Sequence, residues 1–115
     1  MKNWQDYLLV PYQKKGSSLS GCDCWHYVAL VDSRYAVDTD PQTPDGLKEI
    51  ADKFAVVVVP SVGDLVMLGR QECTHVGIVV ERDRFLQMTK HGPMVGRIKG
   101  NNTVIGFARP KYANT

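Results

Sequence analysis

Two cysteines separated by one residue lie in the stretch "GCDCWHYVAL", residues 21–30. Asp23 is a residue type that caps helix N-termini, and an apolar pattern with helical spacing follows it. Cys24 would then lie in the first helical turn, where unpaired backbone N–H groups and the helix dipole favour a thiolate. We therefore expect a nucleophilic Cys24 with a lowered pKa, although the charge of Asp23 opposes this. The competing interpretation is a buried structural cysteine on an apolar helix face.

A nucleophilic cysteine requires a base within hydrogen-bond reach, and the chain has three histidines. His26 lies two residues after Cys24 and points to another side of the same helix, so it is a poor partner. His91 lies in the turn-like stretch "TKHGP". His75 begins the apolar stretch "HVGIVV" at a predicted strand end, where a site can form. His75 is the predicted base, against the alternative of an ordinary histidine at the end of a strand.

A third polar group should orient the imidazole of the base. Gln87 lies on the next predicted strand, across a tight turn "ERD", and residues 75 and 87 could face each other in that hairpin. The alternative for Gln87 is a glutamine that faces solvent. His91 is the rival for the third role, with an exposed turn residue as its competing interpretation.

Cysteine spacing also suggests a different class of site. Cys22, Cys24, Cys73 and His75 could be read as four metal ligands in a C-x-C and C-x-H arrangement. Zinc sites more often space each pair by two to four residues, so we expect no metal. Three cysteines also argue against a full disulfide framework, although Cys22 could meet Cys73.

The apolar periodicity predicts helices first and strands afterwards. This order favours an α+β fold with an antiparallel sheet packed against the cysteine helix. The predicted helical segments are residues 3–9, 23–34 and 45–54, the last capped by Asp45 or a residue near it; the apolar run 55–59 ends at Pro60; the predicted strands are 63–68, 74–80, 84–89, 94–98 and 104–110.

Composition sets limits on the function. With 115 residues, 43% of them hydrophobic, and a net charge of +2, the chain is expected to form one domain over residues 1–115. It lacks a basic stripe interleaved with aromatic residues, so a nucleic-acid partner is not expected. No apolar stretch reaches membrane-spanning length, and no signal peptide is recognised, so we expect synthesis in the cytoplasm and no membrane insertion.

Several segments together resemble the NlpC-type family of cell-wall cysteine peptidases, which have a papain-like fold. In family order they are "VPYQKKGSSLSGCDCWHYV", "VGDLVML", "THVGIVV", "RFLQMTKHGPMVGRI" and "VIGFARP", which together span roughly residues 4–110. The resemblance implies that Cys24 is the nucleophile, His75 the general base and Gln87 the third polar residue. Tyr12 matches a tyrosine that helps to hold the substrate or the oxyanion. Trp25 departs from the serine that is common after the nucleophile.

The resemblance also implies a reaction and a setting. Cys24 would cleave an amide of the peptidoglycan stem peptide through a thioester, often the D-glutamyl to diamino-acid amide, with no cofactor. The Cys-Asp-Cys-Trp variant looks most like versions from tailed phages, so phage tail proteins are possible partners. The protein would then be carried in a virion tail or delivered to the periplasm or cell wall. The alternatives are a non-catalytic tail or wall-binding module of the same fold and an amidase that cuts the sugar–peptide bond.

Overall fold

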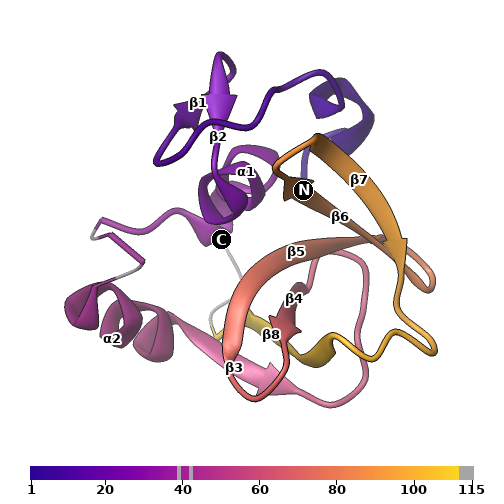
Figure 1. Cartoon of the computed structure of the whole chain (residues 1–115). Helices are drawn as coiled ribbons and strands as arrows, with labels where there is room; N and C mark the ends of the chain where they lie inside the picture. The colour runs from indigo at the N-terminus through magenta and orange to yellow at the C-terminus, as the bar shows by residue number, and fades with distance from the viewer. Residues whose placement is uncertain (39, 42, 112–115) are drawn as a thin grey trace.

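The computed structural model describes residues 1–38, 40–41 and 43–111 (Figure 1). Short 3₁₀ helices and two α-helices precede most of the strands. The elements are η1 (Trp4–Tyr7), β1 (Ser17–Ser18), β2 (Gly21–Cys22), α1 (Cys24–Val31), η2 (Ser33–Tyr35), α2 (Pro44–Lys53), β3 (Phe54–Val57), β4 (Leu65–Gly69), β5 (Cys73–Glu81), β6 (Arg84–Thr89), β7 (Gly92–Arg97) and β8 (Val104–Pro110).

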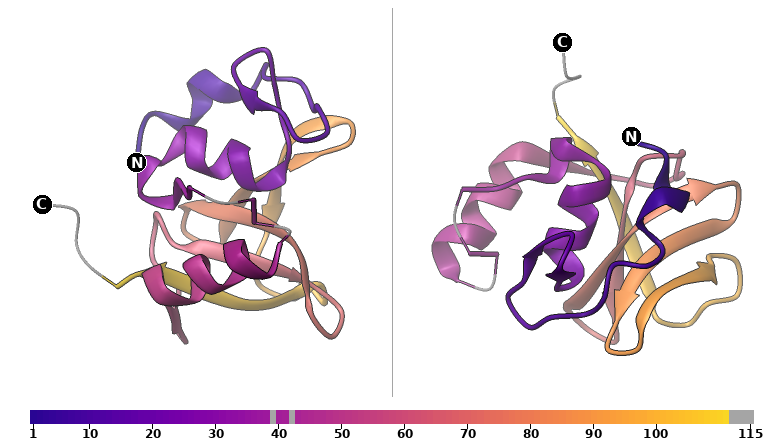
Figure 2. Two further views of the ribbon diagram at one scale, coloured as in Figure 1. Left: turned by 90° about the vertical axis from the view of Figure 1, so that its left-hand side faces the viewer. Right: turned by 90° about the horizontal axis from the view of Figure 1, so that it is seen from above.

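The main sheet has six strands in the order β3-β8-β4-β5-β6-β7, and each neighbouring pair is antiparallel. Figures 1 and 2 show a strongly curved sheet with α1 on one side and α2 near β3. The short β1–β2 hairpin and η1 lie on the far side of α1 from the sheet (Figure 1). The predicted α+β fold, with the cysteine helix on an antiparallel sheet, is confirmed.

Helix α1 begins where the sequence predicts and ends earlier. The Asp23 side chain accepts a hydrogen bond from the backbone N–H of His26 at 2.9 Å, which makes Asp23 the N-cap. The predicted helix over 23–34 stops at Val31, because the carboxylate of Asp32 binds both the backbone N–H and the guanidinium of Arg34. That local bonding begins η2 in place of another α-helical turn.

Alternating side chains of the central strands form two apolar clusters, one on each face of the sheet. On the α1 face, Val76, Ile78 and Val80 of β5 pack in one cluster with the buried side of α1. On the opposite face, Val79 packs with Phe85 and with side chains of β4. Burial on both faces explains why "HVGIVV" is apolar without interruption after its histidine.

Several predicted boundaries need correction. The cap of α2 is Thr43, two residues before Asp45: its hydroxyl accepts from the N–H of Gly46 at 3.1 Å, and a proline follows it in the first turn. The first predicted strand, 63–68, begins two residues later, because Asp64 accepts from the N–H of Ser61 and Gly63 has a φ of +94°. The apolar run 55–59 is paired only through Val57. Among the described residues, no helix is both long and apolar enough to cross a membrane.

Candidate active site

The N-terminal half of β5 lies open on its β6 side. The pairing of β5 with β6 runs from Gly77, opposite Gln87, to Glu81, opposite Arg84. Residues 73–76 therefore have no partner on β6. Helix α1 packs against both strands, and its first residue is Cys24. The open part of the ladder gives the cysteine thiol access to the backbone of β5.

The Cys24 thiol is held by backbone groups in this opening. It is hydrogen bonded to the backbone of Val76 and to that of Trp25, and both bonds lower its pKa. Burial has the larger effect, and together with the charge of Asp23 it raises the pKa of Cys24 above the ordinary cysteine value. The sequence-based expectation of a lowered pKa is therefore wrong in direction. The helix N-terminus favours a thiolate, but desolvation outweighs it here.

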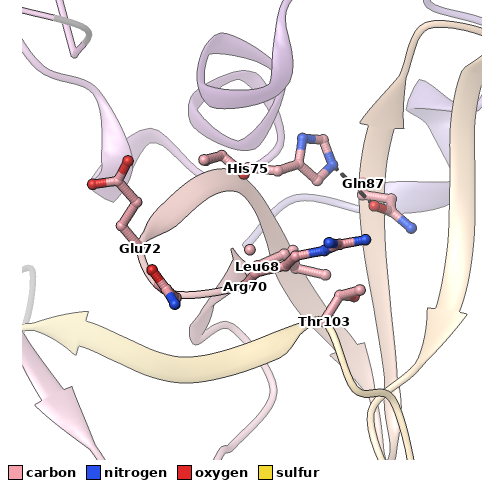
Figure 3. A pocket seen from close by; sticks show the side chains of 9 residues that line it. Leu68, Arg70, Glu72, His75, Gln87 and Thr103 are labelled. Carbon is pink, nitrogen blue, oxygen red and sulfur yellow. Dashed lines mark hydrogen bonds between the residues drawn. The ribbon is translucent and has the colours of Figure 1, made fainter.

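His75 and Gln87 form a hydrogen-bonded pair (Figure 3). The imidazole Nε2 lies 2.9 Å from the amide Oε1 of Gln87. A carbonyl oxygen can only accept, so Nε2 must carry the hydrogen, and Nδ1 of the neutral ring is left with a free lone pair. Burial lowers the pKa of His75, and the bond to Gln87 opposes this more weakly. The resting ring is therefore a neutral base with a fixed tautomer.

The strand register explains how this pair meets. The hydrogen bond confirms that residues 75 and 87 face each other, as the hairpin predicts, although Gly77 is the residue directly opposite Gln87. His75 lies two residues away on the same face and reaches Gln87 along the diagonal, a distance that long side chains can span. A Cβ at position 77 would lie 2.7 Å from the backbone oxygen of Leu86 and 2.9 Å from the ring of Phe85. Sequence reasoning missed Gly77; the histidine–valine–glycine spacing was the available signal.

The remaining sequence-predicted residues lie in different surroundings. Tyr12 is 36% exposed and forms an isolated bridge with Cys22, which places its segment two residues from Cys24. His91 lies in the β6–β7 turn, where its backbone N–H donates to Thr89. The His26 ring lies 2.8 Å from the carboxylate of Asp23.

The other two cysteines have distinct roles in the fold. Cys22 is buried, donates its thiol hydrogen to the backbone oxygen of Ser18 at 3.1 Å, and has a pKa raised to about 11, chiefly by burial. Cys73 is exposed, and all three thiols are free.

Within residues 1–38, 40–41 and 43–111, no group of three or more His, Cys, Asp or Glu side chains is arranged to hold a metal. Cys22, Cys24, Cys73 and His75 are therefore not brought together as a set of ligands.

A cavity of about 940 Å³ adjoins the imidazole–amide pair (Figure 3). Its walls come from the end of β4, the β4–β5 turn, the start of β5, Gln87 and Thr103. Cys24 does not line it, whereas His75 does.

The fold and the site together define a class of protein. A cysteine at the start of a helix, packed on an antiparallel sheet whose strand carries a histidine held by an amide oxygen, is the arrangement of papain-like folds. The NlpC/P60 family model matches residues 9–104. The chain belongs to the NlpC/P60 family.

Solved structures support the fold. The NlpC/p60 domain of the peptidoglycan hydrolase SagA has 21% identity and a TM-score of 0.63, over 91% of this chain and 90% of that chain. A lipoprotein-like NLP/P60 protein from Staphylococcus aureus Mu50 has 20% identity and a TM-score of 0.66, over 96% of this chain and 39% of that chain. An NlpC/P60 protein from Bacillus cereus ATCC 10987 has 15% identity and a TM-score of 0.65, over 90% of this chain and 36% of that chain.

The lengths of these proteins differ. This chain spans nearly all of the SagA domain, but little more than a third of the other two chains. At these identities the likeness establishes the fold alone. A search of the curated proteins finds no match.

Proposed function

We propose that this protein is a cysteine peptidase that hydrolyses an amide bond in the peptidoglycan stem peptide. The observation that carries the proposal is the bond between His75 Nε2 and Gln87 Oε1, beside a cysteine thiol bound to the backbone of the next residue, Val76. This bond leaves Nδ1 as the only ring atom that can take a proton. A fixed base beside a thiol is what nucleophilic catalysis requires.

The proposed reaction begins from a neutral pair, because burial raises the pKa of Cys24 and lowers that of His75. As the sulfur attacks the amide carbon, the thiol proton moves to Nδ1 of His75. The oxyanion would be met by the backbone N–H of Cys24, which has no partner inside its helix, and by the nearby Tyr12. The C–N bond then breaks, Nδ1 protonates the leaving amine, and a thioester forms.

Water completes the proposed cycle. His75 Nδ1 takes a proton from water as the water oxygen attacks the thioester carbon. The C–S bond breaks, the acid product leaves, and the proton returns to the sulfur. Gln87 stays bound to Nε2 throughout. It fixes the ring orientation but, as a neutral amide, supplies no charge to the imidazolium.

The substrate class is supported by the family rather than by the site geometry. NlpC/P60 membership and the likeness to a domain of the peptidoglycan hydrolase SagA support a hydrolase of the cell wall. The stem-peptide amide and the thioester route are finer proposals. Delivery to the cell wall, from a phage tail or otherwise, is a proposal of the same kind.

Digestion of purified peptidoglycan tests the proposal. Mass spectrometry of the released fragments should show new peptide amine and acid ends for the wild-type protein and none for Cys24→Ala. Cys73→Ser is the matched control, because this thiol is exposed and lies outside the proposed reaction.

Other products would identify the alternatives. Free intact stem peptides with sugar strands left unsubstituted would indicate an amidase that cuts the sugar–peptide bond. Wall binding by a folded wild-type protein that releases no fragment would contradict the peptidase and favour a binding module.

A further inference from the structure

The β4–β5 turn projects a cation into the cavity beside the His75–Gln87 pair. The turn comprises residues 70–72, between Gly69 at the end of β4 and Cys73 at the start of β5. A Cβ at Gly69 would overlap the backbone oxygen of Glu72, so the turn closes this tightly only with glycine at its base. Arg70 and Glu72 both line the cavity. The turn therefore places two charged side chains at fixed points along its wall.

The two charges face in different directions. Figure 3 shows the Arg70 guanidinium extending across the cavity toward Gln87, whereas the Glu72 carboxylate points away from it. Among the described residues, Arg70 makes neither a hydrogen bond nor an ion pair. A guanidinium presents five N–H donors in a planar fork that matches a carboxylate. The Arg70 guanidinium is thus unpaired on the cavity side, although Glu72 lines the same cavity.

Gln87 adds a second donor to the same space. Its Oε1 is occupied by His75, and its amide nitrogen has no partner among the described residues. The amide nitrogen carries two N–H groups and accepts nothing. Because the side chain lines the cavity, these donors and the guanidinium are available to one anionic group. The same residue that fixes the His75 tautomer can therefore contact the substrate.

We propose that Arg70, assisted by the amide nitrogen of Gln87, binds a free carboxylate on the peptide next to the scissile amide. This proposal rests on the function proposed above and deepens it, since it names a specificity-determining residue. A peptide held by its carboxylate in the cavity lies against the His75 ring, which positions its amide for the thiol beyond. Arg70 contacts the bound ground state, so its loss weakens binding and leaves the chemical step largely intact.

Matched peptides test the proposal in the Cys24→Ala protein, where no cleavage disturbs the binding measurement. The first pair is a γ-D-glutamyl–lysine amide with its α-carboxylate free and the same peptide with that group as a carboxamide. The second pair differs only in a free carboxylate or carboxamide on the lysine. Calorimetry should show about tenfold tighter binding of the carboxylate in at least one pair, an effect typical of an exposed charged contact.

Arg70→Ala should remove this preference, and Arg70→Lys should restore part of it, because lysine keeps the charge but loses the fork. The preference should also weaken with added salt. Arg82→Ala is the control, since Arg82 lies at the β5–β6 turn and lines a different cavity. An unchanged preference in Arg70→Ala, or no carboxylate preference in either pair, would overturn the inference. Cleavage of the same peptides by the wild-type protein tests the proposed function separately.

Discussion

The two halves of strand β5 have opposite properties. Gly77 and Ile78 are paired with both β4 and β6, Val79 and Glu81 are paired with β6, and the side chains of residues 78–80 are buried. Residues 73–76 are paired only with β4, and the first three are partly or fully exposed. The second half therefore joins the two apolar clusters, while the first half carries His75 and the backbone contact to Cys24. One strand supplies both a rigid support and an open site.

The proposed base, His75, is held in place although it lies outside both apolar clusters. Ile78 fixes the position of the strand through its contacts with α1, and two residues earlier Val76 does the same at the edge of that cluster. His75 then needs only one further bond, from Gln87, to be fixed in orientation. Substitutions in the two halves should consequently affect different properties.

The largest expected effect is a loss of turnover when His75, in the open half of β5, is substituted. His75→Ala removes the proposed base and should lower kcat by about 1000-fold or more. The free energy of unfolding should change by only about 1 kcal/mol, because the imidazole lies outside both apolar clusters. Peptide hydrolysis together with urea unfolding measures both. A His75→Ala protein that keeps a tenth or more of wild-type turnover would remove the histidine from the reaction.

The matching change in the buried half should affect stability. Ile78→Ala leaves a cavity against α1 and should lower the free energy of unfolding by about 2–5 kcal/mol. The molecules that remain folded should keep most of their kcat, since no group of the site is removed. Comparing urea midpoints and kcat for Ile78→Ala and His75→Ala therefore separates the two halves. A wild-type urea midpoint for Ile78→Ala would mean that this half does not hold the strand.

A smaller loss of turnover is expected when Gln87 is substituted on the neighbouring strand β6. Gln87→Ala frees the ring to rotate and to exchange tautomers, and should lower kcat by about 10- to 100-fold. His91→Ala is the control, because His91 lies in the β6–β7 turn and outside the cavity. It should retain wild-type kcat. A large loss in His91→Ala alone would transfer the third role to that residue.

The smallest effect concerns pH. Burial lowers the pKa of His75, so the base stays neutral and active as the pH falls through the ordinary histidine range. The acid limb of kcat/KM should therefore lie below the ordinary pKa of about 6.5. The unfolded chain binds the proton first, so stability should fall as pH drops from that ordinary value to the lowered one. An acid limb at or above the ordinary value would contradict the buried, neutral ring.

The sequence predicted the fold class and the location of the cysteine helix, because apolar periodicity and the Asp23 cap are local signals. It also brought His75 and Gln87 onto neighbouring strands, since the tight turn between them is short. It could not predict the register that puts Gly77 opposite Gln87, because pairing depends on how the two strands end. The sign of the Cys24 pKa shift was also out of reach, since desolvation is a property of the packed structure. The single-domain prediction over 1–115 stays a prediction.

In the proposed reaction Cys24 forms a thioester with the acyl part of the substrate. The direct measurement is acid quenching of the protein during peptide turnover, followed by peptide mapping in a mass spectrometer. We expect an added acyl mass on the fragment that contains Cys24, removed by hydroxylamine. In His75→Ala this adduct should not build up. Steady turnover with no adduct on Cys24, or with the adduct on Cys73, would exclude Cys24 as the nucleophile.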